Sequence, residues 1–228
     1  MAILSSAASP NTVFETHSKF NGDIKVVDKG RTRKLIINGT LQSSNFDSPI
    51  IPKMCWGKIA QVTSELSSVG RILILGLGGG TVAKLLSVKY PGVEIVSVDI
   101  DPVVVDVARK YFDVDSIPNH RIIVADACGV VTSPEEYGLS PNEFDAVVVD
   151  IFQGEVYPDI GNSGSFFAGI KKLIRPEGLA IFNRIYLNHH QDDVNNFIEN
   201  VSEFYVGVKS VIIAGYTNSD HIVIYGSV

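Results

Sequence analysis

Three aspartates each follow an apolar run that is typical of a buried strand. Asp99 follows residues 96–98, Asp126 follows 121–125, and Asp150 follows 144–149. Ligands of open α/β sheets bind at the carboxyl ends of the strands. A carboxylate there can accept hydrogen bonds from a ligand or take up a proton as a general base. We therefore expect the three aspartates at one ligand-binding edge. The alternative for each is a helix cap or a turn.

Glycines occupy the turn after the apolar run 71–75, and a helical pattern follows over 82–90. Glycine lets a backbone approach a ligand closely and permits positive φ, and a helix start offers free N–H groups. We expect this turn to contact a nucleoside and Asp99 to accept ribose hydroxyls. The alternative is that the glycines serve helix–sheet packing alone. The residues of the turn are Gly76, Leu77, Gly78, Gly79 and Gly80.

The turn matches neither of two common phosphate-binding motifs. Thr81 stands where the dinucleotide motif G-x-G-x-x-G needs its last glycine, and no lysine follows as a P-loop requires. An adenosyl sulfonium has no pyrophosphate to cradle. The short turn therefore favours a ligand of this type.

Bulk composition narrows the function classes. The chain has 228 residues, 45% of them hydrophobic, and a net charge of −6. One sizeable globular domain is expected, and a broad nucleic-acid-binding face is not. No apolar run reaches the roughly 18 residues of a membrane span, so we expect a soluble, cytoplasmic protein without membrane partners. Cys55, Cys128 and the pair His189-His190 lack metal-ligand spacing, and no metal site is expected.

The order of elements divides the chain into three parts. Residues 1–11 are expected to be a disordered tail, and 12–48 a small antiparallel region of β-hairpins separated by Asn-Gly and Lys-Gly turns. The main domain, 49–228, begins with a helical pattern over 49–66. Strands and helices then alternate, with helices at 102–112, 165–174 and 191–204, strands at 179–183, 208–214 and 221–225, and a hairpin loop at 215–220. Asp101 and Pro102 predict an N-cap and a first helical residue.

These features together resemble the spermidine synthase family of aminopropyltransferases. The likeness rests on the element order, the glycine turn, Asp99-Ile100, Asp126-Ala127 and Asp150, and extends from about Phe14 to the end of the chain. It implies an α/β fold, a doubly wound Rossmann-like sheet of the methyltransferase type. That sheet has seven strands, mostly parallel, with the last strand antiparallel, and a small antiparallel β region precedes it. Ordinary methyltransferases usually carry an acid where this chain has Ile74.

The resemblance also implies roles for single residues. S-adenosylmethionine or its decarboxylated form would be the group donor, with residues 76–80 against its amino-acid side. Asp99 would bind the ribose, and Ile100 would lie against the adenine. Asp126, followed by Ala127, would accept the adenine amino group. Gln42 ends a segment, 39–42, that resembles the family's nucleoside-contacting segment, although it could also be a plain surface residue.

The residues at the positions expected to contact the acceptor differ from those of the family's polyamine enzymes. Gly79 and Gln153 stand where those enzymes carry aspartates, and 49–53 stands where they carry a Tyr-His-Glu run. A polyamine needs carboxylates or aromatic faces around its charges. Glu155, Tyr157 and Asp159 could replace some of that charge or simply belong to a covering loop.

We therefore expect transfer of an alkyl group, a methyl group in the lead hypothesis, to a small-molecule acceptor that is not a polyamine. Asp150 would act as the catalytic base beside the donor. Polyamine aminopropyl transfer and an inactive nucleoside-binding protein are the alternatives. A homodimer through the hairpins is also expected from the resemblance. Trp56 is predicted to belong to the core, and His221 to be an ordinary half-buried residue.

Overall fold

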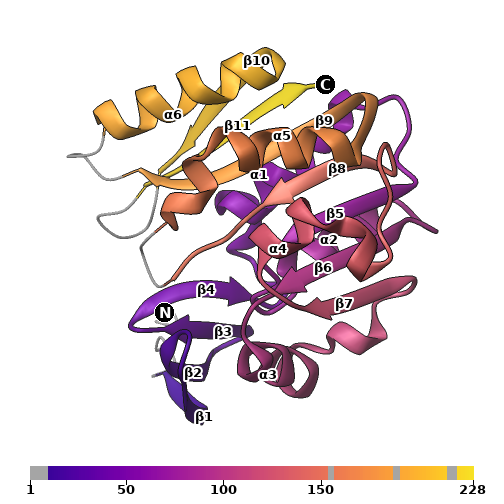
Figure 1. Ribbon diagram of the computed structural model, residues 1–228. Coiled ribbons are helices and arrows are strands. Elements are labelled where there is room, and N and C mark those ends of the chain that lie inside the picture. Colours follow the sequence, from indigo (N-terminus) through magenta and orange to yellow (C-terminus); the bar gives the residue numbers. More distant parts are fainter. Residues whose placement is uncertain (1–9, 154–156, 187–190, 215–219) are drawn as a thin grey trace, which may run out of the picture.

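A small antiparallel sheet forms the N-terminal part of the protein. The computed structural model describes residues 10–153, 157–186, 191–214 and 220–228. The predicted tail falls almost entirely outside these ranges, and β1 already begins at Asn11. The sheet has the order β1-β2-β3-β4 (Figure 1), with β1 at Asn11–Ser18, β2 at Gly22–Lys29, β3 at Thr32–Ile37 and β4 at Thr40–Ser44.

The main sheet has seven strands in the order β10-β11-β9-β8-β5-β6-β7. Strands β5 to β9 pair in parallel, while β11, the last strand in the chain, is antiparallel to both β9 and β10. The predicted fold class is therefore confirmed. The strands are β5 (Arg71–Leu75), β6 (Glu94–Asp99), β7 (His120–Val124), β8 (Phe144–Val149), β9 (Ile174–Tyr186), β10 (Val206–Ile213) and β11 (Asp220–Ser227).

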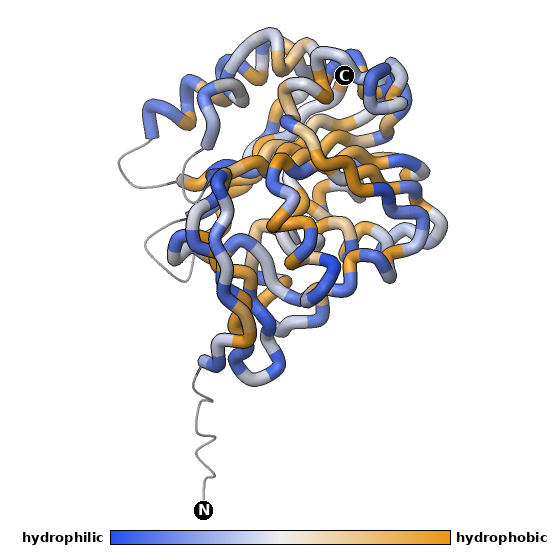
Figure 2. Tube along the Cα trace, turned by 60° about the horizontal axis from the view of Figure 1, so that its bottom comes forward, coloured by the Kyte–Doolittle hydropathy of each residue, from blue (hydrophilic) through white to orange (hydrophobic). Residues whose placement is uncertain are grey.

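Helices cover both faces of the main sheet. One buried cluster joins the sheet to α1, α2 and part of α3, and a second joins the opposite face to α4, α5 and α6. Figure 2 accordingly shows the hydrophobic segments gathered toward the middle of the molecule and many hydrophilic segments around its outside. The helices are α1 (Cys55–Val62), α2 (Thr81–Lys89), α3 (Pro102–Phe112), α4 (Ala127–Thr132), α5 (Gly164–Leu173) and α6 (Gln191–Phe204).

The N-terminal sheet packs on α3 and does not stand apart from the main sheet. Apolar side chains of β2 and β3 share a cluster with Val104 and Val107. Asp101 is fully buried between the two parts. One of its carboxylate oxygens accepts from the Val103 N–H at 2.9 Å, which confirms the predicted N-cap. The other accepts from Ser18 and from the Asn21 side chain, so one carboxylate both starts α3 and anchors the hairpin.

Three predicted elements differ from the structure. The helical pattern at 49–66 is broken into α1 and flanking 3-10 turns, and Pro52 in the first of these turns has no N–H to donate in a continuous helix. Residues 175–178 do not stop a helix before a new strand but bulge out of β9, where Ile174 pairs with Phe144 and Leu179 with Ala146. The short α4 directly after Asp126 was not predicted.

The structure also bears on the expectations about the cysteines, metal ligands and membrane-spanning segments. Cys55 and Cys128 are free thiols, the first buried and the second half-buried. Within the described ranges, no cluster of three His, Cys, Asp or Glu side chains could hold a metal ion, and no helix has the length and apolar character to cross a bilayer. Glu155, the pair His189-His190 and the loop 215–219 lie outside the described residues.

Candidate functional site

A cavity of about 210 Å³ opens where the carboxyl ends of β5, β6, β7 and β8 face β4. Parallel strands that share a sheet bring their carboxyl ends to one edge, so the acids that follow them meet there. Most of the predicted site residues line this cavity: Gln42, Gly76, Leu77, Gly78, Asp99, Ile100, Asp126, Ala127 and Asp150. Gly79 and Gly80 are not among the lining residues.

The glycine turn is shaped by close packing as well as by the cavity. Gly76 has φ +101°, and a Cβ there would lie 2.1 Å from the carbonyl oxygen of Asp150. A Cβ on Gly79 would lie 2.8 Å from Cβ of Ser43. The first glycine thus brings the turn against the end of β8, and Gly79 brings it against β4. Packing is therefore a shown role of these glycines, while Gly76 and Gly78 also line the cavity and their contact with a ligand stays a prediction.

The N–H groups of residues 76–80 are all bonded within the protein. Gly76 donates to the carbonyl of Val98, and Gly80 to that of Leu77. The N–H groups of Leu77 and Gly78 donate to Asp99, and that of Gly79 to Ser43 Oγ. Side chains of Asp99 and Ser43 thus bind three of these groups, and backbone carbonyls bind the other two. The expected free N–H groups belong to the start of α2, which begins at Thr81 after this turn, and that expectation stays a prediction. Residues 76–80 themselves therefore offer a phosphate no free N–H group.

Asp99 binds the turn from the end of β6. Its Oδ2 accepts from Leu77 and Gly78 at 3.1 and 3.2 Å, and its Oδ1 accepts from the Asp101 N–H at 3.0 Å. Burial raises the pKa of Asp99 to about 6, although these N–H groups act in the opposite direction. Each carboxylate oxygen can accept more than one hydrogen bond, so the side chain can hold the turn and still accept from a ligand in the cavity.

Asp150 is held from the opposite side by a chain of polar groups. The Asn183 side chain on β9 donates to Asp150 Oδ1 at 2.7 Å, and Asn183 Oδ1 lies 3.1 Å from Nδ1 of His221 on β11. Burial raises the pKa of Asp150 to about 6, and the Asn183 bond partly offsets this. Burial lowers the pKa of His221 to about 4, so its ring is neutral at pH 7. His221 is half-buried, as predicted, but it also fixes the amide that binds Asp150.

Asp126 combines a capping contact with a place in the cavity wall. Its Oδ1 accepts from the Cys128 N–H at 2.9 Å and starts α4. The side chain is exposed and its second oxygen has no bond to a described residue. The alternatives weighed for this aspartate, a helix cap or a ligand contact, are thus compatible.

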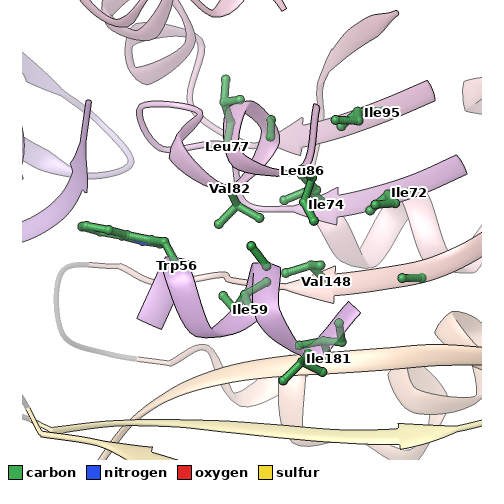
Figure 3. Packing of buried hydrophobic residues seen from close by; sticks show 14 of the residues in the cluster. Trp56, Ile59, Ile72, Ile74, Leu77, Val82, Leu86, Ile95, Val148 and Ile181 are labelled. Carbon is green, nitrogen blue, oxygen red and sulfur yellow. The ribbon is translucent and has the colours of Figure 1, made fainter. Parts of the chain in front are cut away.

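Sequence reasoning did not assign Trp56, Ser43 or Asn183 to the site. Trp56 is only 4% exposed and belongs to the main cluster, as predicted, but it also lines the cavity. In Figure 3 its ring extends from the start of α1, beyond Ile59 and Val82. One signal could have placed Trp56 at the cavity. It stands in the first turn of a helix that begins at the ligand-binding edge of the sheet.

The charged side chains found in the cavity wall are all negative. Of the described residues that line it, three are aspartates and none is a lysine, arginine or histidine. Apolar groups such as Ile100, Val104 and Ala125 supply much of the remaining wall. Such a wall suits a ligand with a flat apolar ring, hydroxyl groups and positive charge, and it disfavours a phosphorylated nucleotide.

Comparison with known proteins finds a family model that matches most of the chain. The model of the spermine/spermidine synthase domain matches residues 58–227. The chain belongs to the spermine/spermidine synthase family. It is 34% identical to a polyamine aminopropyltransferase from Vibrio vulnificus over 113 residues, 50% of this chain and 37% of that protein. It is 30% identical to an eEF1A lysine and N-terminal methyltransferase homolog from Drosophila melanogaster over 122 residues, 50% of this chain and 17% of that protein.

A solved structure extends the likeness to the whole fold. The probable spermidine synthase from Corynebacterium glutamicum superposes with a TM-score of 0.73 at 20% identity, over 98% of this chain and 81% of that one. The chain spans well under half the length of the curated relatives above. The relatives are transferases, and their names include both aminopropyl and methyl transfer. Family membership therefore does not select the transferred group.

Proposed function

We propose that this family member binds S-adenosylmethionine, or a close adenosyl sulfonium, in the 210 Å³ cavity and transfers a methyl group to a small nucleophile that is not a polyamine. The observation that carries the proposal is a wall with three aspartates and, among the residues that the structure describes, no cationic side chain. A sulfonium is a cation and a nucleoside is neutral, so both suit this wall. The bonded N–H groups of the turn support the same ligand class, because residues 76–80 have no free N–H group for a phosphate.

The residues of the cavity fit such a donor. Asp99 would accept the ribose hydroxyls, Ile100 would contact the adenine ring, and the free oxygen of Asp126 would accept the adenine amino group. Gln42 would contact the nucleoside from β4. When bound, the sulfonium supplies an electrophilic alkyl carbon with a neutral thioether as its leaving group.

Asp150 is proposed as the base for the acceptor. Its Oδ1 is held by Asn183, and this leaves Oδ2 for the proton of an incoming nucleophile. A pKa of about 6 makes the group ionised at pH 7 yet basic enough to accept a proton. An acceptor nitrogen would give its proton to Asp150 and become able to attack, and the proton would then leave to solvent.

Three positions speak against a polyamine acceptor. A side chain on Gly79 would collide with Ser43 and the ring of Phe112, so the chain has no room there for the aspartate of polyamine enzymes. Gln153 lines the cavity in place of a second carboxylate. The segment 49–53 leads into the 3-10 turn before α1 and contributes no lining residue. Aminopropyl transfer remains the second candidate, since the matched family model and the Vibrio relative favour it.

Binding and product analysis test the proposal. We expect S-adenosylmethionine and methylthioadenosine to raise the melting temperature, and ATP to leave it unchanged. Mass spectrometry of reactions with candidate amines, peptides and polyamines would identify the transferred group. Turnover of putrescine with decarboxylated S-adenosylmethionine would replace the first candidate with the second. Absence of binding by every adenosyl compound would overturn both. A homodimer and a cytoplasmic location stay predictions, checked by light scattering and cell fractionation.

A further inference from the structure

A second cavity, of about 520 Å³, lies between α6 and the segment 157–162. Among the described residues, none lines both this cavity and the first one. Arg184 in its wall follows Asn183 on β9, and adjacent strand residues point to opposite faces. Asn183 therefore contacts Asp150 on one face, while Arg184 packs with Phe197 on the face covered by α6.

Arg184 is buried between two aromatic rings. The residue is 9% exposed, and its guanidinium carbon lies 4.0 Å from the ring centre of Tyr157 and 4.4 Å from that of Phe197. Nη1 donates to Asn162 Oδ1 at 2.6 Å. Nε is buried and has no hydrogen-bond partner. None of the ion pairs found among the described residues includes Arg184.

A buried guanidinium with an unpaired N–H calls for an anion. Desolvating the charge and leaving Nε without a partner both cost free energy that a bound oxyanion would recover. Nη1 is already bonded to Asn162, so Nε is the guanidinium N–H that lacks a partner, and a carboxylate oxygen could accept from it. The buried hydroxyl of Tyr157 is also unpaired and lines the same cavity. Arg184 and Tyr157, which both line this cavity, thus each have a buried polar atom without a hydrogen-bond partner.

The rest of the wall carries the opposite charge. Asp159 and Asp193 line the cavity, together with the carboxamides of Asn196 and Asn200. Two acids would repel a phosphate dianion but would attract an ammonium group next to a bound carboxylate. We propose that this cavity binds a small zwitterion of the amino-acid class, with its carboxylate on Arg184 Nε and its ammonium group toward the acids. The site goes beyond the proposed transferase function and does not depend on it.

Ligand titration against single variants tests this site. Glycine, L-glutamine and L-lysine would be titrated by calorimetry, beside L-lysine methyl ester, succinate and inorganic phosphate. We expect saturable binding of at least one amino acid with a Kd of roughly 1 mM or below. The ester, which lacks the carboxylate, should bind at least about tenfold more weakly than lysine if lysine binds. Arg184→Met and Arg184→Lys should lose at least about tenfold in affinity for the amino acid that binds.

Two further variants keep the test decisive. Tyr157→Phe retains the ring stacked on Arg184 and removes only the unpaired hydroxyl, so it should fold as the wild type does and bind less tightly. Arg109→Met is the control, since Arg109 is an exposed arginine paired with Asp115 and distant in sequence from the site. Equal binding by wild type, Arg184→Lys and Tyr157→Phe would overturn the proposal. So would tighter binding of phosphate or succinate than of every amino acid, or no saturable amino-acid binding.

Discussion

The side-chain amide of Asn183 on β9 donates a hydrogen bond of 2.7 Å to Oδ1 of Asp150, which directly follows the parallel strand β8. The bond fixes the carboxylate that we propose as the base. It also lowers the pKa of Asp150 against the larger effect of burial, which raises it to about 6. His221 completes the arrangement by binding the amide oxygen of Asn183 at 3.1 Å.

The first prediction follows from this bond. Asn183→Ala should raise the pKa of Asp150 above its wild-type value by about one unit or more, since a hydrogen bond to a charged group contributes about 1.5–3 kcal/mol. Carboxyl-carbon NMR titration would measure the change without any acceptor. His221→Gln is the matched control, because glutamine can still donate to Asn183 and should leave the pKa of Asp150 nearly unchanged. An equal pKa in Asn183→Ala and wild type would remove the proposed influence of Asn183.

Asp150→Asn should slow turnover while stabilising the fold at alkaline pH. The folded pKa, about 6, lies above the ordinary 3.8, so the folded protein binds this proton more tightly than the unfolded chain. The free energy of unfolding therefore falls as the pH rises from about 4 through about 6. Removing the charge should raise that free energy by roughly 1–3 kcal/mol at pH 8 and change it little at pH 4.

The kinetic half of this prediction needs an acceptor. Loss of a general base typically costs about 10²–10⁴-fold in kcat, and donor affinity should change by less than about 1 kcal/mol. Denaturant unfolding at the two pH values, beside single-turnover kinetics, would measure both effects. A mutant with unaltered kcat would show that Asp150 is not the base, and one that loses stability at pH 8 would contradict the pKa argument.

Local patterns carried most of the fold prediction. The apolar run before Gly76 and the β-branched run before Asp150 can be read within a few residues, and both proved to be parallel strands. Asp101 at the start of α3 is local in the same way. Because parallel strands end at one edge, the carboxylates of the cavity could be predicted from their positions alone.

Long-range contacts could not be read in this way. Ser43 accepts from the turn 36 residues further along the chain, and Asn183 reaches Asp150 across 33 residues. No local sequence pattern around Ser43 or Asn183 indicates which residue it contacts. The bulge in β9 was not predicted for a related reason. Pro176 is locally a strand breaker, and only the pairing with β8 shows that the strand continues past it.

Asp99 offers a test that separates charge from hydrogen bonding. Asp99→Ala should lose roughly 1.5–3 kcal/mol in adenosyl-ligand affinity. It should also lower the melting temperature, because three N–H groups donate to this carboxylate. Asp99→Asn keeps one accepting oxygen for the turn and should be less destabilising. Calorimetry with methylthioadenosine and melting curves would measure the two effects, and unchanged affinity in Asp99→Ala would exclude the ribose role.

Gly76 is the position at which the turn should tolerate a side chain least. A Cβ there would lie 2.1 Å from the Asp150 carbonyl oxygen, at φ +101°. Strain and overpacking each cost about 1–3 kcal/mol, so Gly76→Ala should lose about 3 kcal/mol or more in free energy of unfolding. Gly92→Ala is the matched control, since Gly92 has φ +90° and open space around the added Cβ, and it should lose only about 1–2 kcal/mol. Urea unfolding of the two variants would compare them. Equal losses would mean that backbone strain alone, and not contact with Asp150, requires glycine at position 76.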